Sequence, residues 1–151
     1  MDAKAYVKEV EAREEEGTLG DVVYLAGPID HKDPLDDPDS RHGMLNAFIN
    51  ESVTIYCPVC MQRVKRSSPI MAVARNMSAL TQADYMIAVW DGPEEEVSFG
   101  TPVELFAAGS LIPDRTVVIG TMGPGMIASA LRDRGVREVG TYEEAVDLLW
   151  P

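Results

Sequence analysis

The chain has 151 residues and a mass of 16.5 kDa, and 46% of its residues are hydrophobic, which is enough for one domain with its own core and excludes a disordered acidic tail. Its 25 Asp and Glu against 13 Lys and Arg give a net charge of -12, which repels the phosphates of nucleic acid, so we expect no nucleic-acid partner. The first residues lack the apolar run of a signal peptide, and no stretch reaches the roughly 20 apolar residues that span a bilayer. We therefore expect a cytoplasmic protein with no membrane partner.

The pattern of apolar residues predicts alternating helices and strands. Residues 3–16 form a short helix with a weak apolar stripe, and we interpret residues 1–20 as an appendage to a main domain over residues 21–151. Short apolar runs rich in β-branched residues predict strands at 22–26, 53–56, 85–90, 116–120 and 136–139. Helices are expected at 41–50, at 69–82, at 102–110, from the glycine-rich turn at 123–125 to residue 132, and at 142–149, with a polar link over 57–66.

Strands that alternate with helices imply right-handed crossovers and a parallel sheet covered on both faces. The sequence therefore predicts a single α/β domain, doubly wound, with a five-stranded parallel sheet of the flavodoxin-like order. Ligands of such sheets bind beyond the carboxyl ends of the strands. We expect functional residues directly after the first, third and fourth strands.

One candidate is the carboxylate of Glu104, at the start of the helix that follows the third strand. Thr101 and Glu104 match a capping box with Pro102 at the first helical position, and in that interpretation the glutamate only satisfies a backbone N–H. The spacing alone favours capping. The same position also suits a reactive carboxylate, because the first turn of a helix stabilises an anion and lies at the edge of the sheet.

Several short motifs, taken in order, resemble the nucleoside 2-deoxyribosyltransferase superfamily. They are Tyr24-Leu25-Ala26-Gly27-Pro28, Asn76 with Asp84 eight residues later, and Gly100-Thr101-Pro102-Val103-Glu104. The resemblance covers about residues 22–134 and is closest in motif to the 2′-deoxynucleoside 5′-phosphate N-hydrolases and the cytidylate hydrolases. It implies a flavodoxin-like catalytic domain that cleaves an N-glycosidic bond, with Glu104 as the nucleophile on the anomeric carbon. The substrate-binding residues that it implies are Tyr24, Gly27, Pro28, Ile29, Asp91, Ser98, Gly100, Thr101 and Ser129.

The chemistry of the reaction suits these residue types. Breaking the bond from C1′ to the base nitrogen develops positive charge on the sugar and negative charge on the base, so a carboxylate beneath C1′ stabilises or traps the sugar. Many relatives carry Asp where this chain has the second catalytic candidate, Asn76, whose amide can bind the base or sugar but cannot release a proton. Asp84 begins a strand at the opposite edge of the sheet, and we expect it to brace the helix-to-strand turn. Asp91 is either a turn residue or a sugar ligand.

Two serines bear on the substrate. The monophosphate hydrolases carry a serine near the 5′-phosphate at the position of Ser98, and they send a serine that resembles Ser129 into the neighbouring subunit's phosphate site. Hydroxyls suit a phosphate, whereas an acid would repel it. Taken singly, each serine is better explained as a helix cap or an exposed surface hydroxyl. Asp30 stands where an arginine would suit phosphate, although Lys32 lies close by in the sequence.

The Cys57-Pro58-Val59-Cys60 motif invites a zinc or a redox interpretation. Zinc would need His31 and His42, at a spacing unlike that of known zinc fingers, and a redox pair normally opens a helix after the first strand. We expect no metal and no cofactor, with the cysteines lining the base pocket or packing under it. Trp90 and Phe99 flank the predicted site and suit stacking on a base.

The leading hypothesis is hydrolysis of the N-glycosidic bond of a nucleoside 5′-monophosphate, which releases free base and (deoxy)ribose 5-phosphate. The first alternative is a nucleoside 2′-deoxyribosyltransferase that exchanges bases. The second is a non-catalytic nucleotide-binding module, which Asn76 and Asp30 motivate. Because Ser129 resembles a residue shared between subunits, we expect a homodimer or higher homo-oligomer, with the apolar helix at 102–110 as its interface.

Overall fold

The computed structural model describes residues 3–27, 41–49, 52–90 and 100–151, and within them the five strands form one parallel sheet of order β2-β1-β3-β4-β5. The strands are β1 (Asp21–Ala26), β2 (Val53–Tyr56), β3 (Tyr85–Trp90), β4 (Thr116–Gly120) and β5 (Arg137–Val139). This is the flavodoxin-like order, so the predicted fold class is confirmed. The central strands are continuous apolar runs because both of their faces are covered.

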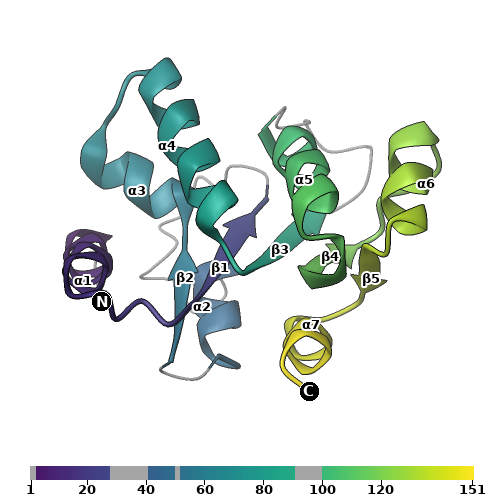
Figure 1. Cartoon of the computed structure of the whole chain (residues 1–151), viewed down its shortest axis with the longest axis horizontal. Helices are drawn as coiled ribbons and strands as arrows, with labels where there is room; N and C mark the ends of the chain where they lie inside the picture. Colours follow the sequence, from purple (N-terminus) through teal and green to yellow (C-terminus); the bar gives the residue numbers. More distant parts are fainter. Residues whose placement is uncertain (1–2, 28–40, 50–51, 91–99) are drawn as a thin grey trace.

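Helices cover both faces of this sheet (Figure 1). One face carries α1 (Ala3–Glu16), α3 (Pro58–Lys65), α4 (Pro69–Gln82), α5 (Gly100–Leu111) and α6 (Met126–Asp133). The other face carries α2 (Arg41–Asn46) and α7 (Tyr142–Leu149). Each face has its own apolar cluster, and strand residues alternate between the two clusters, as with Val23 and Tyr24.

The first helix belongs to the core and is not an appendage to it. Tyr6, Val7 and Val10 are buried in the larger apolar cluster, and α1 packs beside α3. The Tyr6 hydroxyl donates a hydrogen bond of 2.5 Å to the Ile55 carbonyl oxygen and accepts one of 3.0 Å from the backbone N–H of Cys57. The apolar stripe is narrow, but a buried tyrosine with both of these bonds fixes the helix to β2.

The stretch predicted as a polar link is the helix α3. Cys57 is its N-cap, Pro58 stands at its first turn, and Arg66 ends it in the left-handed conformation with φ +48°. The Cys-x-x-Cys motif therefore does open a helix, although after β2. A short 3₁₀ turn, η1 (Pro113–Arg115), precedes β4. No helix of the described residues has the length and apolarity needed to cross a membrane.

Candidate functional site

A tyrosine and a glutamate meet at the carboxyl end of β1. The hydroxyl of Tyr24, a fully buried residue of β1, donates a hydrogen bond of 2.8 Å to Oε1 of Glu104 in α5. These residues are 80 positions apart in the sequence, and they meet because α5 packs over β1 and β3. The bond joins two of the sequence-predicted site residues at the strand end where ligands of this sheet type bind.

Burial sets the proton affinities of this pair. The pKa of Glu104 is raised because its carboxylate is largely removed from water, and the hydrogen bond from Tyr24 opposes that shift. The pKa of Tyr24 is raised far above the ordinary tyrosine value by its burial and by the charge of Glu104. The phenol therefore stays protonated at neutral pH and serves as a fixed donor to the carboxylate.

Glu104 does not act as the glutamate of a capping box. The helix α5 begins at Gly100, so Thr101 lies within the helix and not at its N-cap. The Glu104 carboxylate reaches across to Tyr24, outside its own helix. The capping interpretation that the spacing favoured is therefore wrong, and the carboxylate is placed at the end of the sheet.

Tyr56 is a residue of this region that the sequence analysis did not select. Its ring stacks on the ring of Tyr24 at a centroid separation of 5.5 Å and an interplanar angle of 18°. The two tyrosines are direct partners in the β1–β2 register. The signal was present in the sequence, because both tyrosines occupy the carboxyl ends of predicted strands. Tyr56 is followed directly by Cys57, the N-cap of α3, so the cysteine motif begins next to a ring that stacks on Tyr24.

Asn76 lies in α4, the helix that packs against α5 and β1. Its side-chain oxygen is buried, and among the described residues it has no hydrogen-bond partner. A buried polar atom of this kind is uncommon in a native protein and asks for an explanation, which a bound ligand would supply. Asn76 thus lies on a helix next to the one that carries Glu104, and it is not part of the Tyr24–Glu104 pair.

Asp84 braces the sheet, as the sequence predicted. Its Oδ2 accepts a hydrogen bond of 2.8 Å from the backbone N–H of Val22, and its own N–H donates one of 2.9 Å to the Val22 carbonyl oxygen. Both bonds lie where β1 and β3 begin, at the edge opposite Glu104. The motif spacing between Asn76 and Asp84 therefore joins a site candidate to a structural residue.

The strand ends after β3 and β4 approach each other closely. Gly120 has a φ of +114°, and a Cβ atom built on it would lie 1.9 Å from the Trp90 carbonyl oxygen. Only glycine fits this position without moving the backbone. Trp90 itself is half-buried, and its indole N–H has no hydrogen-bond partner among the described residues.

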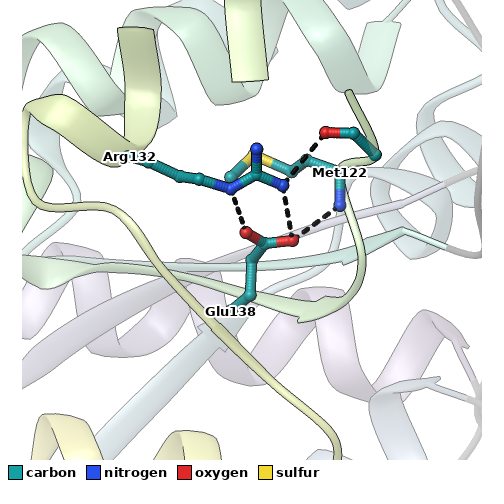
Figure 2. A network of polar contacts seen from close by, with 4 residues as sticks. Met122, Arg132 and Glu138 are labelled. Carbon is teal, nitrogen blue, oxygen red and sulfur yellow. Dashed lines mark hydrogen bonds and ion pairs between the residues drawn. The ribbon is translucent and has the colours of Figure 1, made fainter. Parts of the chain in front are cut away.

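A polar network fixes the turn between β4 and α6 (Figure 2). The guanidinium of Arg132 donates hydrogen bonds to both carboxylate oxygens of Glu138, at 2.5 and 3.1 Å. It also donates a hydrogen bond of 3.0 Å to the Gly123 carbonyl oxygen. Glu138 also accepts a bond from the backbone N–H of Met122, and its pKa is lowered chiefly by Arg132. Ser129 is exposed on the helix that this network holds.

The structure describes only some of the remaining predicted substrate residues. Gly27 follows β1 directly and is half-buried, and Gly100 and Thr101 form the start of α5. The other four lie outside the described residues: Pro28, Ile29, Asp91 and Ser98. Phe99 and the predicted phosphate-side residues Asp30 and Lys32 also lie outside them, and these positions stay predictions.

The fold has a counterpart among solved structures. A 2-deoxyribosyltransferase from the psychrotolerant bacterium Bacillus psychrosaccharolyticus superposes with a TM-score of 0.58 over 83% of this chain and 90% of that one, at 14% identity. The chain shares its fold with a 2-deoxyribosyltransferase. No family model and no curated protein sequence matches the chain. The shared fold agrees with the resemblance that the sequence motifs suggested. In this chain the Tyr24–Glu104 pair lies at the carboxyl end of the sheet.

Proposed function

We propose that this protein is an enzyme that cleaves the N-glycosidic bond of a nucleoside 5′-monophosphate, with Glu104 as the nucleophile. The observation that carries the proposal is the hydrogen bond from the protonated Tyr24 phenol to a largely buried carboxylate at the carboxyl end of the sheet. A 2-deoxyribosyltransferase with the same fold supports a glycosyl-handling activity.

In the proposed reaction the ionised Glu104 carboxylate attacks C1′ of the sugar, and the bond from C1′ to the base nitrogen breaks. Its electron pair leaves with the base, and the positive charge that develops on the sugar is taken up by the new ester to Glu104. Water then attacks C1′, the ester bond breaks, and the sugar phosphate and the Glu104 carboxylate are released. The proton that this water loses balances the one that the base anion takes up. Tyr24 orients one carboxylate oxygen and leaves the other for attack. The unpartnered Asn76 oxygen suits a hydrogen bond from a donor on the substrate.

Transfer of the sugar to a second base is the second candidate, and the activity named for the structural neighbour favours it. It differs from hydrolysis only in what accepts the sugar from Glu104. A non-catalytic nucleotide-binding module has the same fold but no base release. The proposed substrate is the monophosphate because serines stand at the two positions that the sequence analysis assigned to phosphate, Ser98 and Ser129.

The function is tested by incubating the purified protein with a panel of nucleosides and nucleoside 5′-monophosphates, with and without an acceptor base, and measuring free base by chromatography. We expect base release from a monophosphate without an acceptor. Glu104→Gln keeps an acceptor for the Tyr24 hydroxyl but cannot form the ester, so base release should fall by at least about 10³-fold with the fold intact. A Glu104→Gln protein that retains turnover would reject the nucleophile.

Phosphate recognition is tested by replacing Ser98 or Ser129 with alanine. If each hydroxyl binds the 5′-phosphate, the affinity for the monophosphate should fall by roughly 10- to 150-fold, since a charge-assisted hydrogen bond contributes about 1.5–3 kcal/mol. The affinity for the bare nucleoside should stay unchanged. Calorimetric titration of Glu104→Gln protein with both ligands measures this without turnover. Equal losses for the two ligands would favour the transferase.

A further inference from the structure

Two cysteines and a histidine come together at the edge strand of the sheet. The ligand atoms of His42, Cys57 and Cys60 all lie within 4.8 Å of one another. Sγ of Cys60 is 2.8 Å from Sγ of Cys57 and 3.8 Å from Nδ1 of His42. The three residues are 7%, 4% and 0% exposed. The sequence analysis expected no metal, and it did not foresee that one histidine would join both cysteines.

Three separate elements build this cluster. His42 lies in α2, Cys57 follows β2 as the N-cap of α3, and Cys60 lies in the first turn of that helix. The backbone N–H of Cys60 donates to Sγ of Cys57 at 3.4 Å, and such a bond favours the thiolate. The ring of Tyr6 packs edge-on against His42 at 4.9 Å and fixes the imidazole. The residues are therefore held in place from both faces of the sheet.

The pKa of the Cys57 thiol is lowered to about 5, chiefly by the hydrogen bond from the Cys60 thiol and further by His42, against the effect of burial. A lowered pKa of this kind is a mark of redox-active cysteines, so a dithiol function has to be weighed against a metal.

We propose that His42 Nδ1, Cys57 Sγ and Cys60 Sγ bind one zinc ion. Two thiolates and an imidazole are a donor set that zinc takes, and these three ligands leave the fourth tetrahedral position to a further donor. His31, which the sequence analysis named beside His42, lies outside the described residues. Zn–S bonds of about 2.3 Å and Zn–N bonds of about 2.0 Å place the sulfurs about 3.8 Å apart and the nitrogen about 3.5 Å from each. The cysteine sulfurs have to separate by about 1 Å, which side-chain rotation supplies. With only two cysteines in the chain, a four-cysteine iron–sulfur cluster cannot form within one subunit.

A dithiol redox pair is the competing assignment, because a Cys-x-x-Cys at a helix N-terminus with a lowered thiol pKa has that geometry. Exchange requires a thiolate that an incoming disulfide can reach. Here both sulfurs belong to residues that are nearly or fully buried, and a third ligand atom, from His42, converges on them. Burial and the placement of His42 therefore favour the metal.

The proposed ion joins the two layers of helices at one edge of the sheet. The order of the strands makes β2 an edge strand, with α3 on one face and α2 on the other. A metal held by His42 and by the cysteines of the β2–α3 junction ties these helices together across that edge. One of its ligands, Cys57, directly follows Tyr56, whose ring stacks on Tyr24.

The test uses the full chain purified under reducing conditions without chelator, with zinc and protein measured on the same sample by elemental mass spectrometry. We expect one zinc per chain, and less than a tenth of that in Cys57→Ser, Cys60→Ser or His42→Ala. Met61→Leu is the matched control, because Met61 is a buried sulfur-bearing neighbour in the same helix and should keep full zinc content. Replacing zinc with cobalt(II) should give thiolate-to-cobalt charge-transfer absorption and the visible bands of a tetrahedral ion.

The cobalt spectrum of the unaltered chain keeps the proposal testable where a variant fails to fold. Full-length protein that contains no zinc, takes up none in a titration with zinc chloride, and gives no charge-transfer band with cobalt(II) would overturn the proposal. Metal-free protein in which Cys57 and Cys60 interconvert with a disulfide, as mass spectrometry of alkylated samples would show, would assign the redox pair instead. Full zinc content in His42→Ala would remove His42 from the site.

Discussion

Tyr24 connects the proposed nucleophile to the sheet, because it is the residue through which β1 holds Glu104. Its hydroxyl lowers the proton affinity of a carboxyl that burial has raised, so the hydrogen bond widens the pH range in which Glu104 is ionised. This hydrogen bond engages only Oε1 of Glu104, and among the described residues no hydrogen bond engages Oε2. Tyr24 is thus a positioning residue for the proposed reaction and not its proton donor.

Tyr24→Phe tests that role through the pH dependence. Without the hydroxyl the Glu104 pKa should rise further, so the acidic limb of the kcat/KM profile should move to higher pH. We expect kcat at neutral pH to fall by roughly 10–100-fold, while the ring stack on Tyr56 keeps the fold. The measurement is base release from pH 4 to 9, with Tyr56→Phe as the matched control. An unshifted acidic limb would contradict the role of Tyr24.

The sequence could predict Glu104 and Tyr24 because each stands beside a strand end and belongs to a motif with a chemical use. It named His42 beside the two cysteines but set zinc aside because the spacing is unlike that of known fingers. The separations along the chain cannot show that α2 brings His42 close to the β2–α3 junction. Likewise, the capping interpretation failed because a donor outside the helix, the Tyr24 hydroxyl, engages Glu104, and local spacing cannot reveal it.

At the scale of elements, Asp84 joins the starts of β1 and β3. Asp84→Ala leaves the Val22 N–H without its side-chain acceptor, and we expect the free energy of unfolding to fall by about 1–3 kcal/mol. Asp84→Asn keeps an acceptor oxygen and should lose less. Urea denaturation measures the stability, and base release by the folded protein should stay unchanged. Normal stability with lost activity would make Asp84 a catalytic residue.

The strands and their order were predictable because continuous apolar runs separated by helices leave few topologies. The helix α3 was not predictable, because a Cys-Pro-Val-Cys sequence followed by polar residues has little apolar periodicity. What makes it helical is its context, with Cys57 as N-cap, Cys60 and Met61 buried, and α1 packed alongside. The burial of α1 was missed for the same reason, since a weak stripe says nothing of the neighbour it meets.

At the scale of the whole molecule, α4, α5 and α6 lie beside one another on one face of the sheet (Figure 1). All three expose large apolar side chains. In α5, Leu105 and Ala108 are buried in the chain's own core, so they are not available to a partner as the sequence analysis assumed. Phe106 is 53% exposed. The other exposed side chains of this face are Ile70, Met71 and Val73 of α4, Val103 and Leu111 of α5, and Met126 and Ile127 of α6. A homodimer that covers this face stays our expectation, because burying these residues would offset the repulsion of two acidic chains.

Complementation tests whether such a dimer shares its sites. Glu104→Ala and Ser129→Asp proteins should each be inactive alone, the second because an acid repels the proposed phosphate. If Ser129 completes the neighbour's site, random mixing makes half of the dimers hybrids. Each hybrid has one intact site out of its two sites. About a quarter of the activity should therefore return. Sedimentation follows the assembly, and Phe106→Glu should yield monomers. A lack of recovery after confirmed subunit exchange would exclude the shared site.

Tyr6 is made long before the carbonyl group that it binds. The two residues are 49 positions apart, so at the usual pace of about 5–20 residues per second α1 waits roughly 2–10 seconds on the ribosome before β2 follows. During that interval its apolar side chains face water and other nascent chains. A helix with only three residues to bury offers little apolar surface for association with another chain. The sparse stripe that made α1 hard to place from sequence thus protects the growing polypeptide from premature association.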